Sequence, residues 1–229
     1  MKLYIVATPI GNLKDITFRA IEILKEVDLI LCEDTRVTIK LLNHYQIKKP
    51  LLSYHQRSRL SRIEKIIEHL EAGKNLALVT DAGTPGVSDP GGKLIAELKE
   101  YFTEKIEIIS IPGPSALTMA ISVAGINLSR FTFMGFPPNK KGRNTFFADV
   151  LSLRYPVIYY ESPYRFFKNL ELIHKLIYEL NLDKEINLII CRELTKKFES
   201  VKKGNLKEII KFFDENPSKI KGEFVVIIY

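Results

Sequence analysis

The sequence predicts an α/β fold, and three observations lead to this prediction. Short apolar runs of strand length alternate with segments whose apolar residues recur at helical spacing. Runs such as residues 106–111 and 186–191 are mainly apolar, which is typical of strands covered by helices on both faces. The chain has 229 residues, of which 46% are hydrophobic and 27% charged, so it can bury a core and is neither disordered nor collagen-like.

The first half of the chain alternates between strands and helices. We expect strands at residues 2–7, 29–32, 76–79 and 106–111, with helices at residues 16–27 and 93–101. Alternation of this kind is typical of sheets whose neighbouring strands are parallel. The first half is therefore predicted to form a mostly parallel sheet.

The segment IPGPS, residues 111–115, marks the predicted domain boundary. It places two prolines and a glycine between a strand and a helical pattern at residues 116–124, so we expect domains at residues 1–112 and 113–229. The second half contains strand patterns at residues 131–136, 157–160, 186–191, 198–202 and 224–228. Several are separated by only a few residues, which favours antiparallel pairing and a mixed sheet. The predicted architecture is two unequal α/β domains with a cleft between them.

The charge balance points to an anionic partner or to a solvated, lysine-rich surface. Subtracting 27 acidic from 34 basic residues leaves a formal net charge of +7, and the sequence pI is about 9.2. The apolar run at residues 3–7 is too short for a signal peptide core or a membrane span, so we expect a cytoplasmic protein with no membrane partner. Cys32 and Cys191 lack metal-site spacing, and no metal is expected.

The first strand-to-helix turn, ATPIGNL at residues 7–13, allows two interpretations. Pro9 fixes the backbone and Gly11 lets it approach a ligand, but a plain structural turn explains both residues equally well. The segment lacks the glycine spacing of a dinucleotide site or a P-loop. Glu33 and Asp34 follow about twenty residues later, where such a site would have its ribose-binding acid, so a nicotinamide enzyme remains a minor alternative.

The segment DAGTPGVSDPGG, residues 81–92, predicts a ligand-binding loop. Four glycines and two prolines exceed what an ordinary connection needs, and Asp81 or Asp89 can accept hydrogen bonds from a hydroxyl or an amine. A third corner follows at IPGPSA, where Pro114 suits the first helical turn and Ser115 can cap the helix or bind a ligand. We expect the three corners to converge on one edge of the parallel sheet and form a shared pocket.

Basic residues gather in three segments. Between residues 36 and 65 the single acid Glu64 is outnumbered by Arg36, Lys40, Lys48, Lys49, Arg57, Arg59, Arg62 and Lys65, with tyrosines and histidines between them. The other segments are NKKGR at residues 139–143 and the group Lys196, Lys197, Lys202 and Lys203. The first cluster favours a phosphate-contacting surface over a solvated one.

Two glutamates follow predicted strands. Glu161 begins ESPYRF, and Glu193 lies in CRELTKKFES. Ion pairs with Arg165 or Arg192 and a catalytic role are equally compatible with their positions. Hydrolytic triads and dedicated metal motifs do not occur in the sequence.

Taken together, these motifs resemble one family. ATPIGNL, CEDTR, DAGTPGVSDPG, IPGPSA, YESPYR, RELTKKFE and KGEFV occur in the same order as in the bacterial ribosomal RNA small-subunit methyltransferase I family. That family is the cytidine 2′-O-ribose branch of the tetrapyrrole methylase superfamily, many of whose members continue beyond the segment that ends here at Tyr229. The resemblance covers essentially the whole chain. It implies an S-adenosylmethionine-dependent homodimer that binds its cofactor between two α/β domains and methylates a cytidine in the decoding region of 16S rRNA.

The resemblance also implies site residues. Motif matching places the following at the cofactor: Pro9, Ile10, Gly11, Asp81, Ala82, Gly83, Val87, Ser88, Pro112, Gly113, Ser115, Ala116, Tyr160, Glu161, Gly222, Glu223 and Phe224. The expected RNA contacts are Arg36, Arg57, Arg59, Lys140, Lys141, Arg143, Arg192 and Lys196.

A general base would help a ribose hydroxyl attack the activated methyl group. The candidates for this base are Asp34, Glu161 and Glu193, with Arg36, Arg192 or Lys196 orienting phosphate.

Two alternative functions remain open. One is a methyltransferase acting on a precorrin- or uroporphyrinogen-type tetrapyrrole, and the other is a non-catalytic ribosome-binding factor that has kept the fold.

Overall fold

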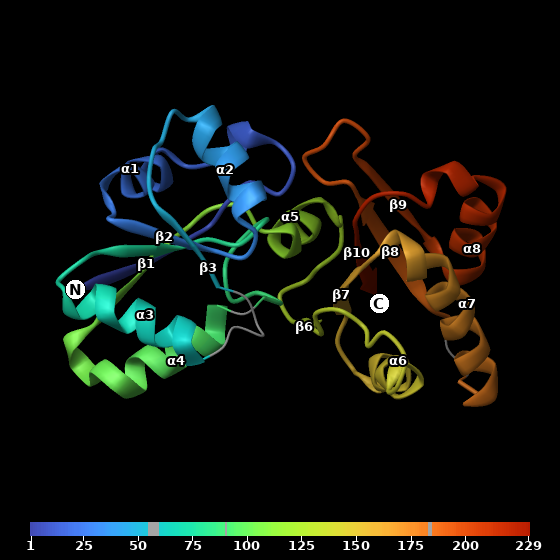
Figure 1. Ribbon diagram of the computed structural model, residues 1–229. Coiled ribbons are helices and arrows are strands. Elements are labelled where there is room, and N and C mark those ends of the chain that lie inside the picture. The colour runs from blue at the N-terminus through green and yellow to red at the C-terminus, as the bar shows by residue number, and fades with distance from the viewer. Residues whose placement is uncertain (55–59, 90, 183–184) are drawn as a thin grey trace. The chain divides into compact units, whose positions relative to one another are not determined.

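The computed structural model describes residues 1–54, 60–89, 91–182 and 185–229. The chain forms two units, Met1–Ser115 and Ala116–Tyr229, each built around its own sheet (Figure 1). The division between the units falls within the IPGPSA segment, between Ser115 and Ala116. This is three residues after the boundary expected from the sequence. None of the described helices is long and apolar enough to span a bilayer.

Unit 1 contains a five-stranded sheet in which all paired strands are parallel, as predicted. The strand order is β3-β2-β4-β1-β5. The strands are β1 (Lys2–Val6), β2 (Leu29–Cys32), β3 (Leu51–Ser53), β4 (Leu76–Leu78) and β5 (Glu107–Ile111). Strand β3 was not predicted, because three half-buried residues at a sheet edge leave no clear apolar run.

Helices cover both faces of this sheet, with α1 and α2 on one side and α3 and α4 on the other (Figure 1). They are α1 (Phe18–Glu26), α2 (Thr35–His44), α3 (Leu60–Glu71) and α4 (Gly91–Phe102), with 3₁₀ turns at Leu13–Asp15 and Thr103–Lys105. The helix predicted at residues 16–27 begins at Phe18, because the Thr17 side chain accepts a 3.1 Å hydrogen bond from the Ala20 amide and caps it. An apolar cluster lies on each face of the sheet, and buried leucines of α1 and α4 contribute to these two clusters.

Unit 2 contains a mixed sheet, also as predicted, with the order β6-β7-β10-β8-β9. The strands are β6 (Thr132–Phe133), β7 (Val157–Glu161), β8 (Asn187–Arg192), β9 (Ser200–Asn205) and β10 (Phe224–Ile228). Strand β10 is antiparallel to both β7 and β8, and β8 is antiparallel to β9.

Strand β6 differs from its prediction. It is two residues long instead of spanning residues 131–136, and it pairs with β7 in parallel. Gly135 adopts a left-handed backbone with φ of 63°, and the prolines that follow at 137 and 138 have no amide to donate. The parallel direction follows because helix α6 (Arg143–Ser152) connects β6 to β7.

The helices of unit 2 are α5 (Ala116–Val123), α6, α7 (Pro163–Glu179) and α8 (Leu206–Glu215), followed by a 3₁₀ turn at Pro217–Lys219. Apolar residues of α6, α7 and α8 pack with strands of the sheet in one buried cluster, in which the rings of Phe166 and Phe224 stack 4.0 Å apart. Helix α5 begins at Ala116, so Pro114 precedes the helix instead of occupying its first turn, and its carbonyl accepts a hydrogen bond from the Thr84 hydroxyl.

The strand register brings three predicted site segments of unit 2 to one edge of its sheet. Phe224, the first residue of β10, pairs with both Glu161 and Arg192, the last residues of β7 and β8. At the opposite edge Ile228 pairs with Val157 and Leu188. We call the first of these the Glu161 edge.

Candidate functional site

The loops that follow β1 and β4 are joined at the carboxyl edge of the unit 1 sheet. Thr8 and Gly83 exchange two backbone hydrogen bonds, of 2.9 and 3.0 Å. The Thr8 hydroxyl also donates to the Thr80 carbonyl at 3.0 Å. These bonds fix the glycine-rich loop, residues 81–89, beside the ATPIGNL turn.

The corner after β5 joins the same group of loops. The Thr84 hydroxyl donates to the Pro114 carbonyl at 3.1 Å, and the Ala7 amide donates to the Ile111 carbonyl at 3.3 Å. A side-chain carbon on Gly113 would lie only 2.9 Å from the Ala7 methyl group, so the close approach of these loops requires glycine. The structure thus brings together the three corners that the sequence analysis expected to converge.

The two aspartates of the glycine-rich loop have different surroundings. Asp89 Oδ1 accepts hydrogen bonds from the Gly86 amide at 2.6 Å and from the Gly91 amide at 3.0 Å, so this carboxylate closes the loop and caps α4. Asp81 is exposed. Its Oδ1 accepts a 3.1 Å hydrogen bond from the Asp34 amide. Of the two, Asp81 is the one available to a ligand.

Asp34 lies at the same edge, at the start of α2. Its carboxylate accepts a 2.8 Å hydrogen bond from the Arg36 amide and pairs with the Arg36 guanidinium at 2.6 Å. Hydrogen bonds from Arg36 lower the pKa of Asp34 from 3.8 to about 2. Partial desolvation raises the pKa of Asp81 instead. Asp34 is therefore firmly ionised, and Asp81 holds a proton more readily.

The exposure of the remaining predicted residues of unit 1 is compatible with a ligand site. Gly11, Ala82, Ser88, Pro112 and Gly113 are exposed, Val87 and Ser115 are partly buried, and Pro9, Ile10 and Gly83 lie beneath them. The predicted RNA contacts Arg57 and Arg59 lie outside the described residues.

In unit 2, Glu161 is the centre of a buried hydrogen-bond network. Its side chain has no exposed surface and accepts hydrogen bonds from the Ser162 amide at 2.7 Å and from the Asn169 side chain. The Arg165 guanidinium lies 3.3 Å from the Glu161 carboxylate. The ion pair considered in the sequence analysis is therefore present. Arg165 and Asn169 follow Glu161 by four and eight residues, a helical spacing that could have revealed the whole network.

Arg165 extends this network to the NKKGR loop. Its Nη1 donates to the Pro137 carbonyl at 3.0 Å and to the Asn139 side chain, while Nε donates to the Ser162 hydroxyl at 3.2 Å. Arg143, a predicted RNA contact, donates to carbonyl groups of its own loop at Pro138 and Asn139. Lys140 and Lys141 are exposed. The loop is thus fixed at its base, and its two lysine side chains are exposed to solvent.

Glu193 lies at the start of a second network at the same edge. Its Oε1 accepts a 2.9 Å hydrogen bond from the Glu223 amide, and Lys196 Nζ lies 3.0 Å from Glu193 and 2.8 Å from the Glu223 carboxylate. Partial burial opposes ionisation of Glu193, but the bonds from Glu223 and Lys196 outweigh it and lower the pKa of Glu193. Gly222 has φ of 91°, and a side-chain carbon there would overlap the Glu193 carboxylate.

Two further predicted residues lie beside these networks. Arg192 Nε donates to the Lys221 carbonyl at 2.7 Å, and its Nη1 donates to the Phe198 carbonyl at 2.9 Å. Tyr160 is partly buried, with its ring 5.0 Å from that of Phe133 and 5.3 Å from that of Phe136. The Arg192 guanidinium thus donates hydrogen bonds to main-chain carbonyl groups. Phe136 is exposed and shortly precedes the NKKGR loop in the chain.

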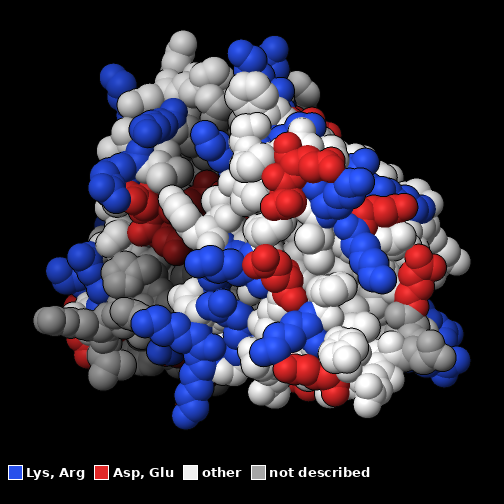
Figure 2. All heavy atoms as spheres, turned by 90° about the vertical axis from the view of Figure 1, so that its right-hand side faces the viewer, with Lys and Arg blue, Asp and Glu red and all other residues white. Residues whose placement is uncertain are grey.

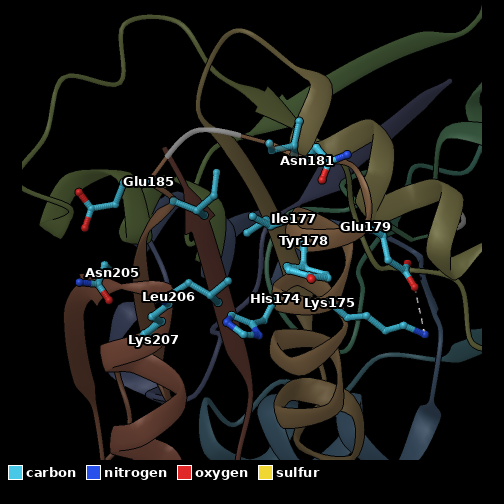
Figure 3. Close-up of a pocket in the computed structure, with 12 residues that line it drawn as sticks. His174, Lys175, Ile177, Tyr178, Glu179, Asn181, Glu185, Asn205, Leu206 and Lys207 are labelled. Atoms are coloured by element: carbon cyan, nitrogen blue, oxygen red, sulfur yellow. Dashed lines mark ion pairs between the residues drawn. The ribbon is translucent and has the colours of Figure 1, made fainter.

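One cavity of unit 2 lies away from all of these residues. It has a volume of about 1080 Å³ and is bounded by the end of α7, the start of β8 and the start of α8, including Tyr178, Ile186 and Leu206 (Figure 3). Asn187 begins β8, at the edge opposite the Glu161 edge. The cavity contains none of the predicted site residues. In the described part of the chain, no group of three or more His, Cys, Asp or Glu residues could hold a metal ion.

Comparisons with known proteins identify the family. A model of the tetrapyrrole (corrin/porphyrin) methylases matches residues 2–210. A Thermotoga maritima protein named ribosomal RNA small subunit methyltransferase I is 44% identical over 99% of this chain and 97% of its own length. Proteins of the same name from Mycoplasmopsis pulmonis and Synechocystis are 45% and 44% identical, and the match covers 97% and 78% of their lengths and 100% and 99% of this chain.

Solved structures confirm the fold. A cobalt precorrin-4 methyltransferase of cobalamin biosynthesis superposes with a TM-score of 0.67 at 17% identity, covering 99% of this chain and 94% of that one. The methyltransferase CobJ superposes with a TM-score of 0.68 at 20% identity, covering 99% and 92%. The chain belongs to the ribosomal RNA small subunit methyltransferase I family of the tetrapyrrole methylases.

Proposed function

We propose that this protein transfers a methyl group from S-adenosylmethionine to the RNA of the small ribosomal subunit. The observation that carries the proposal is the identity of 44–45% over almost the whole chain with relatives named for that activity. The acceptor that we propose, the 2′-hydroxyl of a cytidine in the decoding region of 16S rRNA, follows from the resemblance of the DAGTPGVSDPG and YESPYR motifs to that branch of the superfamily.

The chemistry of the unit 1 edge fits this cofactor. Exposed backbone at Gly11 and Gly113 can bind a carboxylate, and the exposed Asp81 can accept hydrogen bonds from ribose hydroxyls or from an ammonium group. When bound, S-adenosylmethionine supplies an activated methyl group on a sulfonium. We propose that the three joined loops hold it, together with Tyr160 and residues 222–224 of unit 2. The role of the chain is then to orient the acceptor and exclude water.

The proposed general bases are Asp34, Glu161 and Glu193, and their contacts favour Asp34. It lies at the loop edge beside Asp81, whereas Glu161 is buried against Arg165 and Glu193 is fixed by Lys196. Its low pKa makes it a weak base while Arg36 is bound. If Arg36 turns to an RNA phosphate, Asp34 loses this partner and its basicity rises. We propose that substrate binding activates Asp34 in this way.

Methyl transfer from labelled S-adenosylmethionine tests the reaction. The acceptors are 30S subunits and free 16S rRNA from cells that lack this methyltransferase, with the modified nucleoside identified by mass spectrometry. A 2′-O-methylated cytidine is expected. Transfer to a precursor tetrapyrrole but not to ribosomal RNA would favour the tetrapyrrole alternative. Absence of cofactor binding in calorimetry would favour the ribosome-binding factor.

Single-turnover rates of three variants test the base. Asp34→Asn keeps an N-cap and should lower the rate by roughly 10² to 10⁴, the usual contribution of a general base. Glu161→Gln and Glu193→Gln should change it much less once folding is confirmed by circular dichroism. Equal rates in all three variants and the wild type would contradict the proposal that one of these acids is the general base.

We also propose that the protein is a homodimer, which light scattering on the purified protein can test.

A further inference from the structure

We propose that unit 2 has a second RNA-binding surface, at the end of its sheet opposite the Glu161 edge. The surface consists of Arg130, Phe131, Arg154 and Tyr155, and we call it the Arg130 patch. The inference rests on the proposed function, because it assumes that the substrate is an RNA.

Two guanidinium groups surround one exposed tyrosine in this patch. Arg130 Nη1 donates a 3.0 Å hydrogen bond to the Tyr155 hydroxyl. The Cζ atoms of Arg130 and Arg154 lie 5.7 and 5.8 Å from the centre of the Tyr155 ring. Tyr155 is 38% exposed and the neighbouring Phe131 is 37% exposed. The contacts hold the arginines close to the aromatic ring while leaving part of the ring open to a ligand.

The patch carries positive charge that is not neutralised locally. Within the described part of the chain, neither Arg130 nor Arg154 forms an ion pair, whereas Arg36, Arg165 and Lys196 all do. The sequence around the patch, residues 128–136 and 150–156, contains Arg130 and Arg154 and no acidic residue. These segments therefore attract a polyanion.

The face of unit 2 formed by α7 and α8 provides a contrast. There, Lys and Arg side chains are intermixed with Asp and Glu (Figure 2), and Lys175 pairs with Glu179 at 3.4 Å and Lys211 with Glu215 at 3.9 Å. Pairs of this kind are typical of a solvated helix face. Among the described residues, no acidic side chain pairs with Arg130 or Arg154 in this way.

The position of the patch sets the length of RNA that can contact both the patch and the Glu161 edge. Arg130 and Tyr155 precede the parallel strands β6 and β7, so both lie at the amino ends of these strands. Glu161 lies at the other end of β7, and the four steps from Val157 to Glu161 span roughly 13 Å. A single nucleotide cannot contact both places. An RNA that contacts the Glu161 edge must extend over several nucleotides to reach the patch.

The chemistry favours RNA as the occupant. Arginine pairs with phosphate through two parallel hydrogen bonds, and exposed aromatic rings stack on unpaired bases without strong preference for sequence. The patch combines two arginines that form no ion pair with any described residue and two exposed aromatic rings, so it can hold backbone and bases together. We infer that it binds a single-stranded segment flanking the acceptor nucleotide.

The test compares the double variant Arg130→Ala/Arg154→Ala with the control Lys175→Ala/Lys211→Ala, which removes the same charge from the α7 and α8 face. With free 16S rRNA, the patch variant should raise KM about tenfold or more with little change in kcat. It should also reduce the slope of log Kd against log salt by about 1.4 to 1.8, because two phosphate contacts are lost. The control should change each quantity much less.

Two further variants separate stacking from charge. Tyr155→Phe keeps the ring and should bind RNA nearly as well as the wild type. Tyr155→Leu should weaken binding by about tenfold, the usual effect of losing one stacked base. A short RNA that carries the acceptor but does not reach the patch should be less sensitive to all of these changes.

The outcomes distinguish this inference from the proposed function. If the wild type does not methylate ribosomal RNA, the proposed function fails and the inference fails with it. If the wild type is active but the patch variant and the control have the same KM and salt slope, the inference alone is overturned. Loss of affinity for 30S subunits with unchanged affinity for free 16S rRNA would also overturn it, because the occupant would then be a ribosomal protein.

Discussion

At the Glu161 edge, the role of a single residue depends on the groups that it contacts. Glu193 and Gly222 are an example, since the glutamate side chain occupies the space that a side chain at position 222 would need. Lys196 and the Glu223 amide hold the glutamate there. The glycine and the ion pair therefore depend on each other.

Gly222→Ala should destabilise the protein more than Gly73→Ala does. Both glycines have left-handed backbones, with φ of 91° and 79°, but a side-chain carbon at Gly73 would meet nothing within 4 Å. The control should cost about 1 kcal/mol through backbone strain alone. The Gly222 variant should add the cost of displacing Glu193 from Lys196. Urea unfolding measures both, and equal losses would contradict the close contact.

Arg36→Ala should raise the pKa of Asp34 from about 2 toward its ordinary value near 3.8. The native pKa is depressed, so the interactions of Asp34 stabilise the folded state above about pH 4 and are lost as the pH falls toward 2. Carboxyl titration by NMR checks the value. Because the pair is exposed, the effect on stability should be small and should weaken in high salt. An unchanged pKa in the variant would contradict the role of Arg36.

Among the elements, α7 organises unit 2 by joining the sheet to the NKKGR loop. Its first turn carries Arg165 and its second carries Asn169, and both bind Glu161 at the end of β7. The same arginine holds the loop that starts the α6 connection. A change at Glu161 or Arg165 is therefore expected to alter the loop as well as the core.

Arg165→Ala should lower the free energy of unfolding by about 3 kcal/mol or more. The Glu161 side chain has no exposed surface and that of Arg165 is 18% exposed, so the variant leaves a buried carboxylate without its partner. Adding Glu161→Gln to this variant should restore part of the loss, because no buried charge remains. Urea unfolding of the single and double variants gives the comparison.

The same variant tests the loop. Amide hydrogen exchange at residues 139–141 should become faster in Arg165→Ala at denaturant concentrations where the core stays protected. If exchange in the loop is unchanged while stability falls, Arg165 supports the core without fixing the loop.

For the molecule as a whole, two units with different sheets each gather their predicted site residues at one sheet edge. Unit 1 does so because carboxyl ends of parallel strands share an edge. Unit 2 does so because β10 is antiparallel to both β7 and β8, which places its first residue beside their last ones.

Binding of S-adenosylmethionine should slow amide hydrogen exchange in segments of both units. The expected segments are residues 81–89 and 113–115 in unit 1 and residues 222–224 in unit 2, because each contains residues that are proposed to contact the cofactor. At 100 times the dissociation constant the cofactor should stabilise the protein by about 2.7 kcal/mol. Protection in the cavity lining around Tyr178 serves as the control and should not change. Protection confined to unit 1 would contradict the assignment of residues 222–224.

Much of this organisation could be predicted from the sequence. Strand β2 begins and ends where its apolar run does, and the two sheet types follow from the lengths of the connections. Strand β3 and the short β6 could not be predicted, because their limits depend on an edge position and on the Gly135 backbone. The three converging corners could be predicted, since a parallel sheet places every carboxyl end at one edge.

The linear pattern of apolar runs, glycines and prolines was enough to determine the α/β class, the two units and the family, because these depend on local periodicity and on motifs in a fixed order. It left Glu161 and Glu193 equally open to catalysis or ion pairing, and only the family resemblance, not the residue pattern of the loop, favoured Asp81 over Asp89. Those choices depend on which groups lie within hydrogen-bond distance, and that distance is set by packing between residues far apart in the chain. Only the tertiary structure buries Glu161 against Arg165, closes the loop with Asp89 and leaves Asp81 exposed.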